Sequence, residues 1–139
     1  MVFSDIDFFF CSMIKYNENA IYLIGGKQND KWSNKTWIVD PKNGYQIREG
    51  PSLNNVRHSH GCAKMVINNR VLLVVTGGLG TSHTDFLNTV EILDPLSHKG
   101  WLLGKYIALS SFFVKFEVFK SYLVNLMITD TTLYHQNLP

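Results

Sequence analysis

The chain has few cysteines and few charged residues, and each shortage excludes a class of protein. Its 139 residues include only two cysteines, Cys11 and Cys62, which cannot build a disulfide framework. They lie 51 positions apart. We therefore expect them to be small buried thiols at equivalent positions of a repeat, which favours a reducing compartment.

Charged residues are also scarce, and their two signs nearly balance. Charged residues make up 17% of the chain, the net charge is +2, and no cluster of Lys or Arg stands out. The electrostatic footprint of a nucleic-acid-binding protein is therefore not expected. Hydrophobic residues make up 45%, which is typical of a folded globular domain and argues against disorder.

Long apolar runs are missing as well. The short run Phe8-Phe9-Phe10 follows acidic residues instead of the basic stretch that opens a signal peptide. The longest apolar candidate, Ile107 to Ile128, is interrupted by three charged residues, so it does not read as a membrane span. We expect a soluble, cytoplasmic protein with no membrane partner.

Two glycine pairs are the most informative feature that is present. Gly25-Gly26 and Gly77-Gly78 each end a short apolar run, and the pairs lie 52 positions apart. A repeat of about 50 residues with strand-then-glycine signals predicts blades of a β-propeller.

The residues around the two pairs also match. In each unit two short apolar segments joined by an Asn-containing turn precede the glycines and predict a β-hairpin. Polar loops follow, Lys27 to Ser33 and Leu79 to Phe86. Third strands are predicted up to Asp40-Pro41 and Asp94-Pro95, where proline ends the strand and the Asp carboxylate can bond nearby backbone. Fourth strands are predicted at 45–48 and 101–104.

These residues resemble the kelch repeat. The family pattern is a Gly-Gly doublet, an Asp-Pro, an aromatic that opens strand four, a Gly-Pro, and an Arg-x-x-His that leads into the next blade. Here the matching residues are Gly25, Gly26, Asp40, Pro41, Tyr45, Gly50, Pro51, Arg57, His60, Gly77, Gly78, Asp94, Pro95 and Trp101. Tyr45 stands where the family usually has tryptophan, and it keeps a large ring for packing.

The resemblance implies an all-β fold with about two four-stranded antiparallel kelch-type blades, an incomplete propeller. Blade one is expected over 11–58 and blade two over 59–104. An atypical segment over 1–10 precedes them, and a non-kelch apolar tail over 105–139 suits a helix and a strand equally well. Because two blades leave apolar faces open, the simplest expectation is a fragment or a mispredicted chain. The alternative is a short form that completes its ring by oligomerising or with its tail.

Several side chains have predicted structural roles. Trp32, Trp37, Tyr22 and Trp101 are expected to pack between the blades. For Arg57 we weigh a partner contact against a guanidinium that ties loops together, and favour the second. His60 is expected to form a hydrogen bond between the blades, and Glu91 and Lys35 are expected at solvated strand edges.

Catalytic and metal signals are weak. His58 and His60 would share one face of a strand, as metal ligands can, but no acidic or Cys partner is near in sequence. There is no nucleophile motif, and the glycine-rich stretch from Thr76 to Ser82 lacks the lysine and helix of a phosphate loop. We predict no enzyme activity and no cofactor.

The resemblance implies a protein-interaction module, as in BTB-kelch ubiquitin-ligase adaptors that recognise substrates or in actin-binding kelch proteins. The loops expected to meet a protein partner contain Asn29, Asp30, Lys31, Trp32, Arg57, His58, Ser82 and His83. The alternatives are a fragment of a small-molecule or metal-binding kelch-type enzyme similar to galactose oxidase, and a truncated chain with no independent function.

Overall fold

The structure is a computed structural model that describes residues 8–104, and every element in this range is a β-strand. The expected tail over 105–139, and most of the expected atypical segment over 1–10, lie outside the described residues. Within the described range no helix is long and apolar enough to cross a membrane. The prediction of an all-β, antiparallel fold is confirmed.

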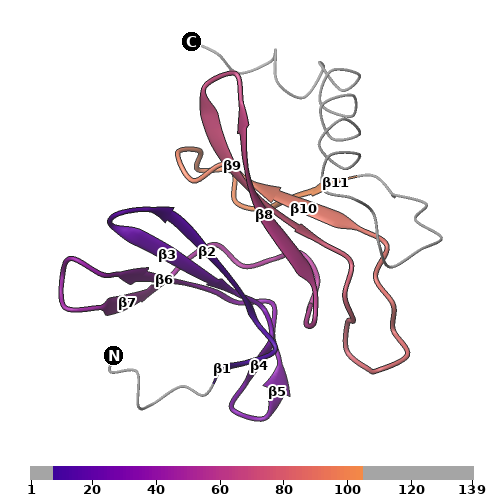
Figure 1. The fold of residues 1–139 in the computed structure, drawn as a ribbon. Coiled ribbons are helices and arrows are strands. Elements are labelled where there is room, and N and C mark those ends of the chain that lie inside the picture. The colour runs from indigo at the N-terminus through magenta and orange to yellow at the C-terminus, as the bar shows by residue number, and fades with distance from the viewer. Residues whose placement is uncertain (1–7, 105–139) are drawn as a thin grey trace. The chain divides into compact units, whose positions relative to one another are not determined.

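Two four-stranded sheets make up most of this range (Figure 1). The first sheet has the order β2-β3-β6-β7 and the second β8-β9-β10-β11, so each follows the chain as an antiparallel meander. The strands of the first sheet are β2 (Ser12–Asn17), β3 (Ala20–Ile24), β6 (Thr36–Asp40) and β7 (Gln46–Glu49). Those of the second sheet are β8 (Gly61–Ile67), β9 (Arg70–Thr76), β10 (Val90–Leu93) and β11 (Leu102–Gly104).

A third, small sheet was not expected from the sequence. It has the order β1-β4-β5, from β1 (Phe8–Phe9), β4 (Lys27–Gln28) and β5 (Lys31–Trp32). The segment expected to be a polar loop is thus a tight hairpin. Its two turn residues, Asn29 and Asp30, both have positive φ, 47° and 63°, as a type I′ turn requires.

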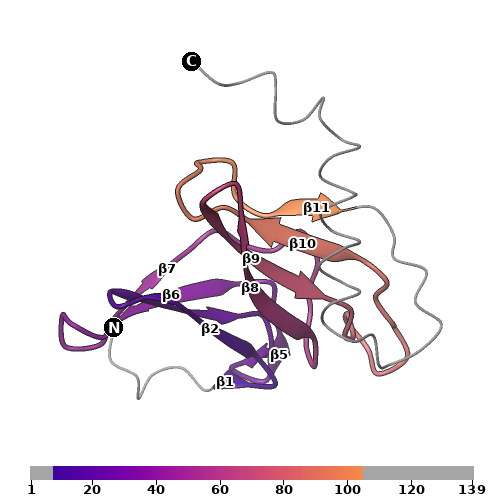
Figure 2. The same cartoon turned by 45° about the horizontal axis from the view of Figure 1, so that its top comes forward.

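The first and second sheets pack face to face, because alternate side chains of their strands are apolar and point to the same side. Tyr22 and Ile24 of β3 and Leu73 and Val75 of β9 belong to one buried cluster, as expected for residues two apart on a strand. Strands β2 and β8 lie side by side where the sheets meet (Figure 2). The whole shared core consists of Ile14, Ala20, Tyr22, Ile24, Ile38, Leu53, Leu73, Val75, Leu93 and Trp101.

The aromatic residues divide between this core and other places. Trp101 and Tyr22 lie in the shared core, and the Trp101 indole N–H is 3.0 Å from the Pro51 carbonyl oxygen and 3.2 Å from Thr36 Oγ1. Trp37 does not lie between the two described sheets, because it packs with Leu23 on the opposite face of the first sheet. Its position on β6, one residue from Ile38, puts it there.

The expectation that Tyr45 packs its ring is also wrong within the described residues. Tyr45 has a φ of 57° and is 60% exposed. It ends the turn between β6 and β7, one residue before the strand begins. Trp101, at the matching place before β11, is 5% exposed.

Both Asp-Pro corners behave as the sequence predicts. Asp40 Oδ1 accepts hydrogen bonds from the backbone N–H groups of Lys42 and Asn43, at 3.0 and 3.2 Å. Asp94 Oδ1 accepts one from the N–H of Leu96 at 3.0 Å. In each case the carboxylate satisfies the turn that follows the strand.

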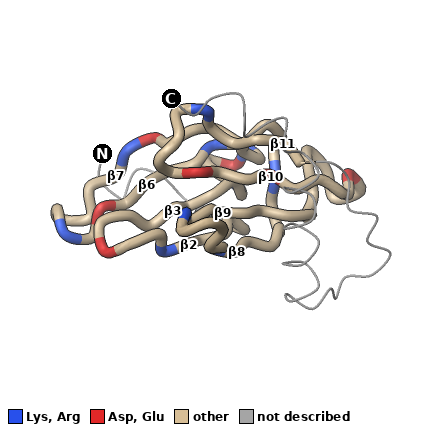
Figure 3. The backbone as a smooth tube through the Cα atoms, turned by 90° about the horizontal axis from the view of Figure 1, so that it is seen from above, with Lys and Arg blue, Asp and Glu red and all other residues tan. Residues whose placement is uncertain are grey.

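Charged residues of both signs are interspersed along the described chain (Figure 3). The cysteines are both free, but the expectation that they are buried is wrong for Cys62, which is exposed. Cys11 is partly buried, and burial is the main reason that its thiol pKa is raised. Cys62 Sγ lies 3.8 Å from the carbonyl oxygen of Met13 on the neighbouring sheet.

Candidate functional site

The segment that connects the two sheets, residues 50–60, is held by buried charge. The guanidinium of Arg57 is fully buried and donates to the carbonyl oxygens of Gly77 and Thr89, at 2.6 and 3.1 Å. It also donates to Thr89 Oγ1 at 2.8 Å and to a carboxylate oxygen of Glu91 at 3.3 Å. This is the internal role that the sequence favoured, and a guanidinium so enclosed cannot meet a partner.

Glu91 corrects an expectation. It was placed at a solvated strand edge, but its side chain is fully buried. Its carboxylate accepts hydrogen bonds from the backbone N–H groups of Asn54 and Asn55, at 2.7 and 3.1 Å, and from the Asn54 side-chain amide at 2.9 Å. A buried carboxylate is tolerable because these donors and Arg57 replace its water. Lys35, by contrast, is exposed as expected and pairs with Glu49.

Burial and the ion pair act on Arg57 in opposite directions. Burial lowers the pKa of the guanidinium, and the nearby Glu91 carboxylate opposes that shift. The signal for Glu91 was present in the sequence. It shares a strand face with Leu93, so period-two alternation places it toward the core.

The two glycine pairs receive the connecting segment on its two sides. The Gly26 N–H donates to the carbonyl oxygen of Arg57 at 2.8 Å, and a Cβ on Gly25 would collide with that same oxygen. A Cβ on Gly78 would lie 2.5 Å from the carbonyl oxygen of His58. Gly25 and Gly78 also have positive φ, 61° and 82°. Both glycine pairs thus serve close backbone contact as well as conformation.

His60 links the sheets directly. Its Nε2 lies 2.5 Å from Ser12 Oγ, at the start of β2. Burial, together with the positive charges of Arg57 and His58, lowers its pKa to about 4. His60 is therefore neutral at physiological pH and serves as a hydrogen-bonding residue.

His58, the other member of the candidate metal pair, lies in different surroundings. Ser59 between the two histidines has a φ of 51°, which breaks the extended backbone that would align their rings. Within residues 8–104, no three His, Cys, Asp or Glu side chains gather so that they could hold a metal ion.

A cluster of rings forms where the connecting segment meets two loops. The Trp32 ring from β5 stacks on His58, with centroids 3.6 Å apart and planes 9° apart. His83, from the loop between β9 and β10, meets both rings edge-on, at 5.8 Å from Trp32 and 5.9 Å from His58. Phe10 lies 6.1 Å from Trp32. We call these four residues the ring cluster.

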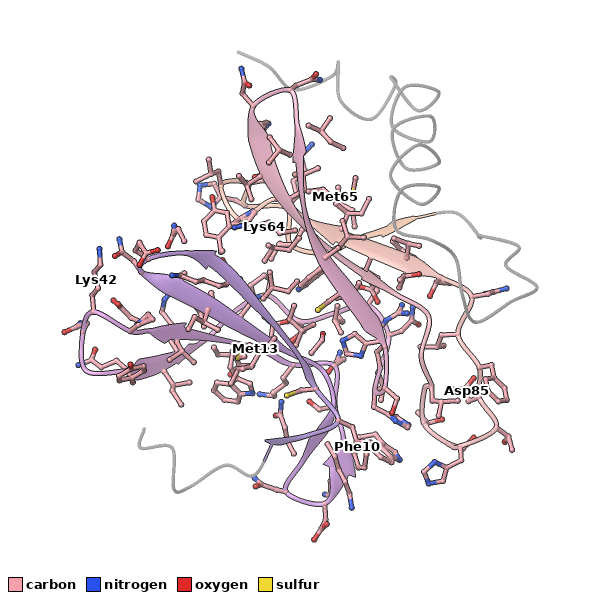
Figure 4. All side chains as sticks on the ribbon, viewed as in Figure 1. Phe10, Met13, Lys42, Lys64, Met65 and Asp85 are labelled. Atoms are coloured by element: carbon pink, nitrogen blue, oxygen red, sulfur yellow. The ribbon has the colours of Figure 1, made fainter. Side chains whose placement is uncertain are left out.

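The ring cluster is open to solvent on one side. Phe10 is 64% exposed, His83 is exposed and Trp32 is partly exposed, whereas His58 is 1% exposed beneath them. Figure 4 shows Phe10 and Asp85 at the same end of the sheets, while Lys42 lies on the distant turn between β6 and β7. Burial, and secondarily the nearby His83, lower the pKa of His58.

Charges beside the ring cluster are balanced. Lys27 Nζ lies 2.9 Å from an Asp30 carboxylate oxygen and 5.8 Å from the centre of the Trp32 ring. The Asp85 carboxylate accepts from the Thr81 N–H at 3.0 Å. An exposed aromatic surface with paired charges fits a partner recognised by ring contact rather than by charge.

The predicted partner-contacting residues therefore fall into two groups. Asn29, Asp30, Lys31, Ser82 and His83 are exposed, and Trp32 is partly exposed. Arg57 and His58 are buried, so their side chains are not open to a partner in this structure. Sequence reasoning missed Phe10, because it gave the segment before residue 11 no role.

The chain matches no protein-family model, and no curated protein matches it at a significant level.

Proposed function

We propose that this chain is a protein-interaction module built from two blades of a kelch-type β-propeller, and that it binds a protein partner at the ring cluster. The observation that carries the interaction role is the convergence of Trp32, His58 and His83. These residues come from three separate segments; Trp32 and His83 are open to solvent, and the buried His58 supports the Trp32 ring from below. Aromatic residues presented by loops on a rigid scaffold are typical anchors of protein interfaces.

The repeat itself supports the propeller part of the proposal. The first glycine of each pair donates to the residue before the third strand: Gly25 to the carbonyl oxygen of Lys35 at 2.9 Å, and Gly77 to that of Thr89 at 3.2 Å. The second glycine of each pair accepts from the returning loop, Gly26 from Ser33 and Gly78 from Leu87. Two sheets with the same strand order and the same internal bonds are what a blade repeat requires.

A propeller closes with roughly 4–8 blades, so the proposal implies further blades. These come either from more of the same polypeptide or from other copies of the chain. Sequencing the transcript on both sides and measuring the mass of the purified protein in solution distinguish the two sources.

The interaction role is tested by photo-cross-linking in cells. A photoreactive residue at His83 is expected to capture one protein, and the same residue at Lys42, on the distant turn, is expected not to capture it. The captured protein is then purified and its affinity is measured. Capture at both positions, or at neither, contradicts the proposal.

A matched pair of variants then locates the contact. Trp32→Ala is expected to weaken binding of the captured protein at least about tenfold, as loss of an aromatic anchor does. Tyr45→Ala also removes an exposed aromatic ring, but on the distant turn, and is expected to change the affinity less than about twofold. Cosedimentation with filamentous actin tests one partner class that the kelch resemblance implies.

A further inference from the structure

The small sheet ends in an unpaired strand next to the ring cluster. Resting on the proposed function, we propose that the free edge of β5 binds an extended peptide segment of the partner. The segment would add as a strand beside β5, with an uncharged aromatic or other apolar side chain against the ring cluster. This mode is β-strand addition, in which main-chain bonds give affinity and side-chain contacts give specificity.

The hairpin register decides which backbone groups face that edge. In a two-residue hairpin, the residues that flank the turn exchange both hydrogen bonds, and these are Gln28 and Lys31. The next pair, Lys27 with Trp32, is then a non-hydrogen-bonded pair, whose N–H and C=O groups point away from each other. The N–H and C=O of Trp32 are therefore directed to the outer edge of β5.

No other described segment takes these two groups. β5 is the last strand of the order β1-β4-β5, and no backbone hydrogen bond between described residues outside the strand ladders reaches Trp32. The connecting segment passes the end of the small sheet, because Ser59 N–H donates to Phe10 O and Arg57 N–H to Ser33 O. It therefore lies across the end of the strands and not along β5.

The opposite edge of the same hairpin already shows this kind of pairing. There β1 adds antiparallel to β4, with Phe8 opposite Gln28 and Phe9 opposite Lys27. Two residues of extended chain are enough to extend the sheet on that side. The proposed peptide repeats the arrangement on the other side, where the ring of Trp32 stands beside the vacant backbone groups.

The charges around this edge select the side chain. Two lysines, Lys27 and Lys31, and two aspartates, Asp30 and Asp85, lie on the segments that carry the rings, so these charges sum to zero. The exposed rings of Phe10 and His83 supply contact area for a flat or apolar group. An uncharged extended segment fits better than an acidic or basic one.

Selection from a displayed library of random ten-residue peptides tests the inference. The purified chain is expected to enrich peptides that share an uncharged aromatic or apolar residue. Trp32→Ala is expected to weaken their binding at least about tenfold, and Tyr45→Ala less than about twofold. Failure to enrich any peptide that depends on Trp32 overturns the inference.

Main-chain bonding needs its own readout. Methylation of individual peptide nitrogens is expected to abolish binding at one or two positions near the anchor residue, since a methyl group removes the donor. Hydrogen exchange of the Trp32 amide is expected to slow at least about tenfold when peptide is bound, because exchange requires an open N–H. The amide of Lys27, already paired with β1, serves as the control that does not change.

The outcomes separate this inference from the proposed function. If peptides bind at Trp32 but tolerate methylation at every nitrogen and leave the Trp32 amide unprotected, strand addition is overturned while an interaction site at the ring cluster remains. If cross-linking at His83 captures no protein but peptides bind as expected, the proposed function in cells is contradicted and the proposed peptide site is supported. Because Trp32→Ala removes a stacked ring, its far-ultraviolet circular dichroism must match that of the original chain. If it does not, Trp32→Phe replaces it, with a smaller loss of affinity expected in the same direction.

Discussion

Glu91 and Arg57 form a buried ion pair that joins the connecting segment to the second sheet. The two charges are paired with each other and form further hydrogen bonds with backbone and side-chain groups, although Arg57 Nε has no hydrogen-bond partner among the described residues. Such a pair adds little net stability compared with apolar residues, but loss of one partner is expensive because the other charge stays buried.

Replacement Glu91→Gln is therefore expected to lower the free energy of unfolding by about 3 kcal/mol, measured by urea denaturation. The matched control is Glu49→Gln, which breaks the exposed pair between Lys35 and Glu49 and should cost less than about 1 kcal/mol. Equal losses in the two variants would contradict the buried network.

His60 makes stability depend on pH. Its pKa is about 4 when folded and near 6.5 when unfolded, so the unfolded chain binds the proton more readily. The stabilisation is complete above pH 6.5 and is lost as the pH falls through about 4, with a total loss on the order of 3 kcal/mol. His58, whose pKa is also lowered, acts in the same direction.

The measurement is the urea midpoint between pH 7.5 and pH 4. His60→Gln keeps a polar group near Ser12 but cannot titrate, so its midpoint is expected to fall less over this range. A variant whose midpoint follows the same curve as the original chain would remove His60 as the cause.

The glycine pairs show how a turn and an inter-sheet contact depend on the same residue. Gly25 and Gly44 have nearly equal φ values, 61° and 63°. A Cβ at Gly44 would meet nothing within 4 Å, whereas one at Gly25 would collide with the Arg57 carbonyl oxygen.

Replacement of each by alanine separates conformation from contact. Gly44→Ala is expected to cost about 1 kcal/mol, the strain of a left-handed backbone alone. Gly25→Ala is expected to cost at least about 2 kcal/mol, because the connecting segment must also move. Thermal unfolding of the two variants checks this. Similar losses of unfolding free energy would mean that the contact with the Arg57 carbonyl does not contribute to stability.

Strand positions could largely be predicted from the sequence, because the apolar runs before the glycine pairs and the Asp-Pro corners mark strand ends by local chemistry. Trp101 was correctly expected to pack between the sheets, because a large ring beside a predicted strand favours burial. Glu91 was missed because alternation was not followed through the charged residue. The hairpin at Lys27 to Trp32 was missed because its strands are only two residues long and carry no apolar period.

The ring cluster could be anticipated only in part. Trp32, His58 and His83 were named as loop residues, but only the packing of the sheets brings their rings together. Burial of Arg57 and His58 likewise depends on residues about 20 to 35 positions away in the chain, a long-range effect that local patterns do not show.

The two large sheets share one apolar core, so residues 8–104 are expected to unfold together. Hydrogen exchange of amides in β3 and β9 should give the same largest free energy of opening, within about 1 kcal/mol, and Leu53→Ala should lower both by about 2–3 kcal/mol. Leu53 lies on the connecting segment and is 2% exposed. Separate free energies for the two strands would indicate that each sheet is stable alone.

The contacts of Arg57 have a consequence for the order of events during synthesis. Its carbonyl group meets Gly25 and Gly26, which leave the ribosome before it, while its guanidinium waits for Thr89 and Glu91, which leave after it. At a translation rate of roughly 5–20 residues per second, a few seconds pass between the synthesis of Arg57 and that of Glu91. The contacts of Arg57 with the second sheet cannot form during that time. During that interval the core residues Tyr22 and Ile24 of the first sheet are not yet covered by Leu73 and Val75 packed in a completed second sheet.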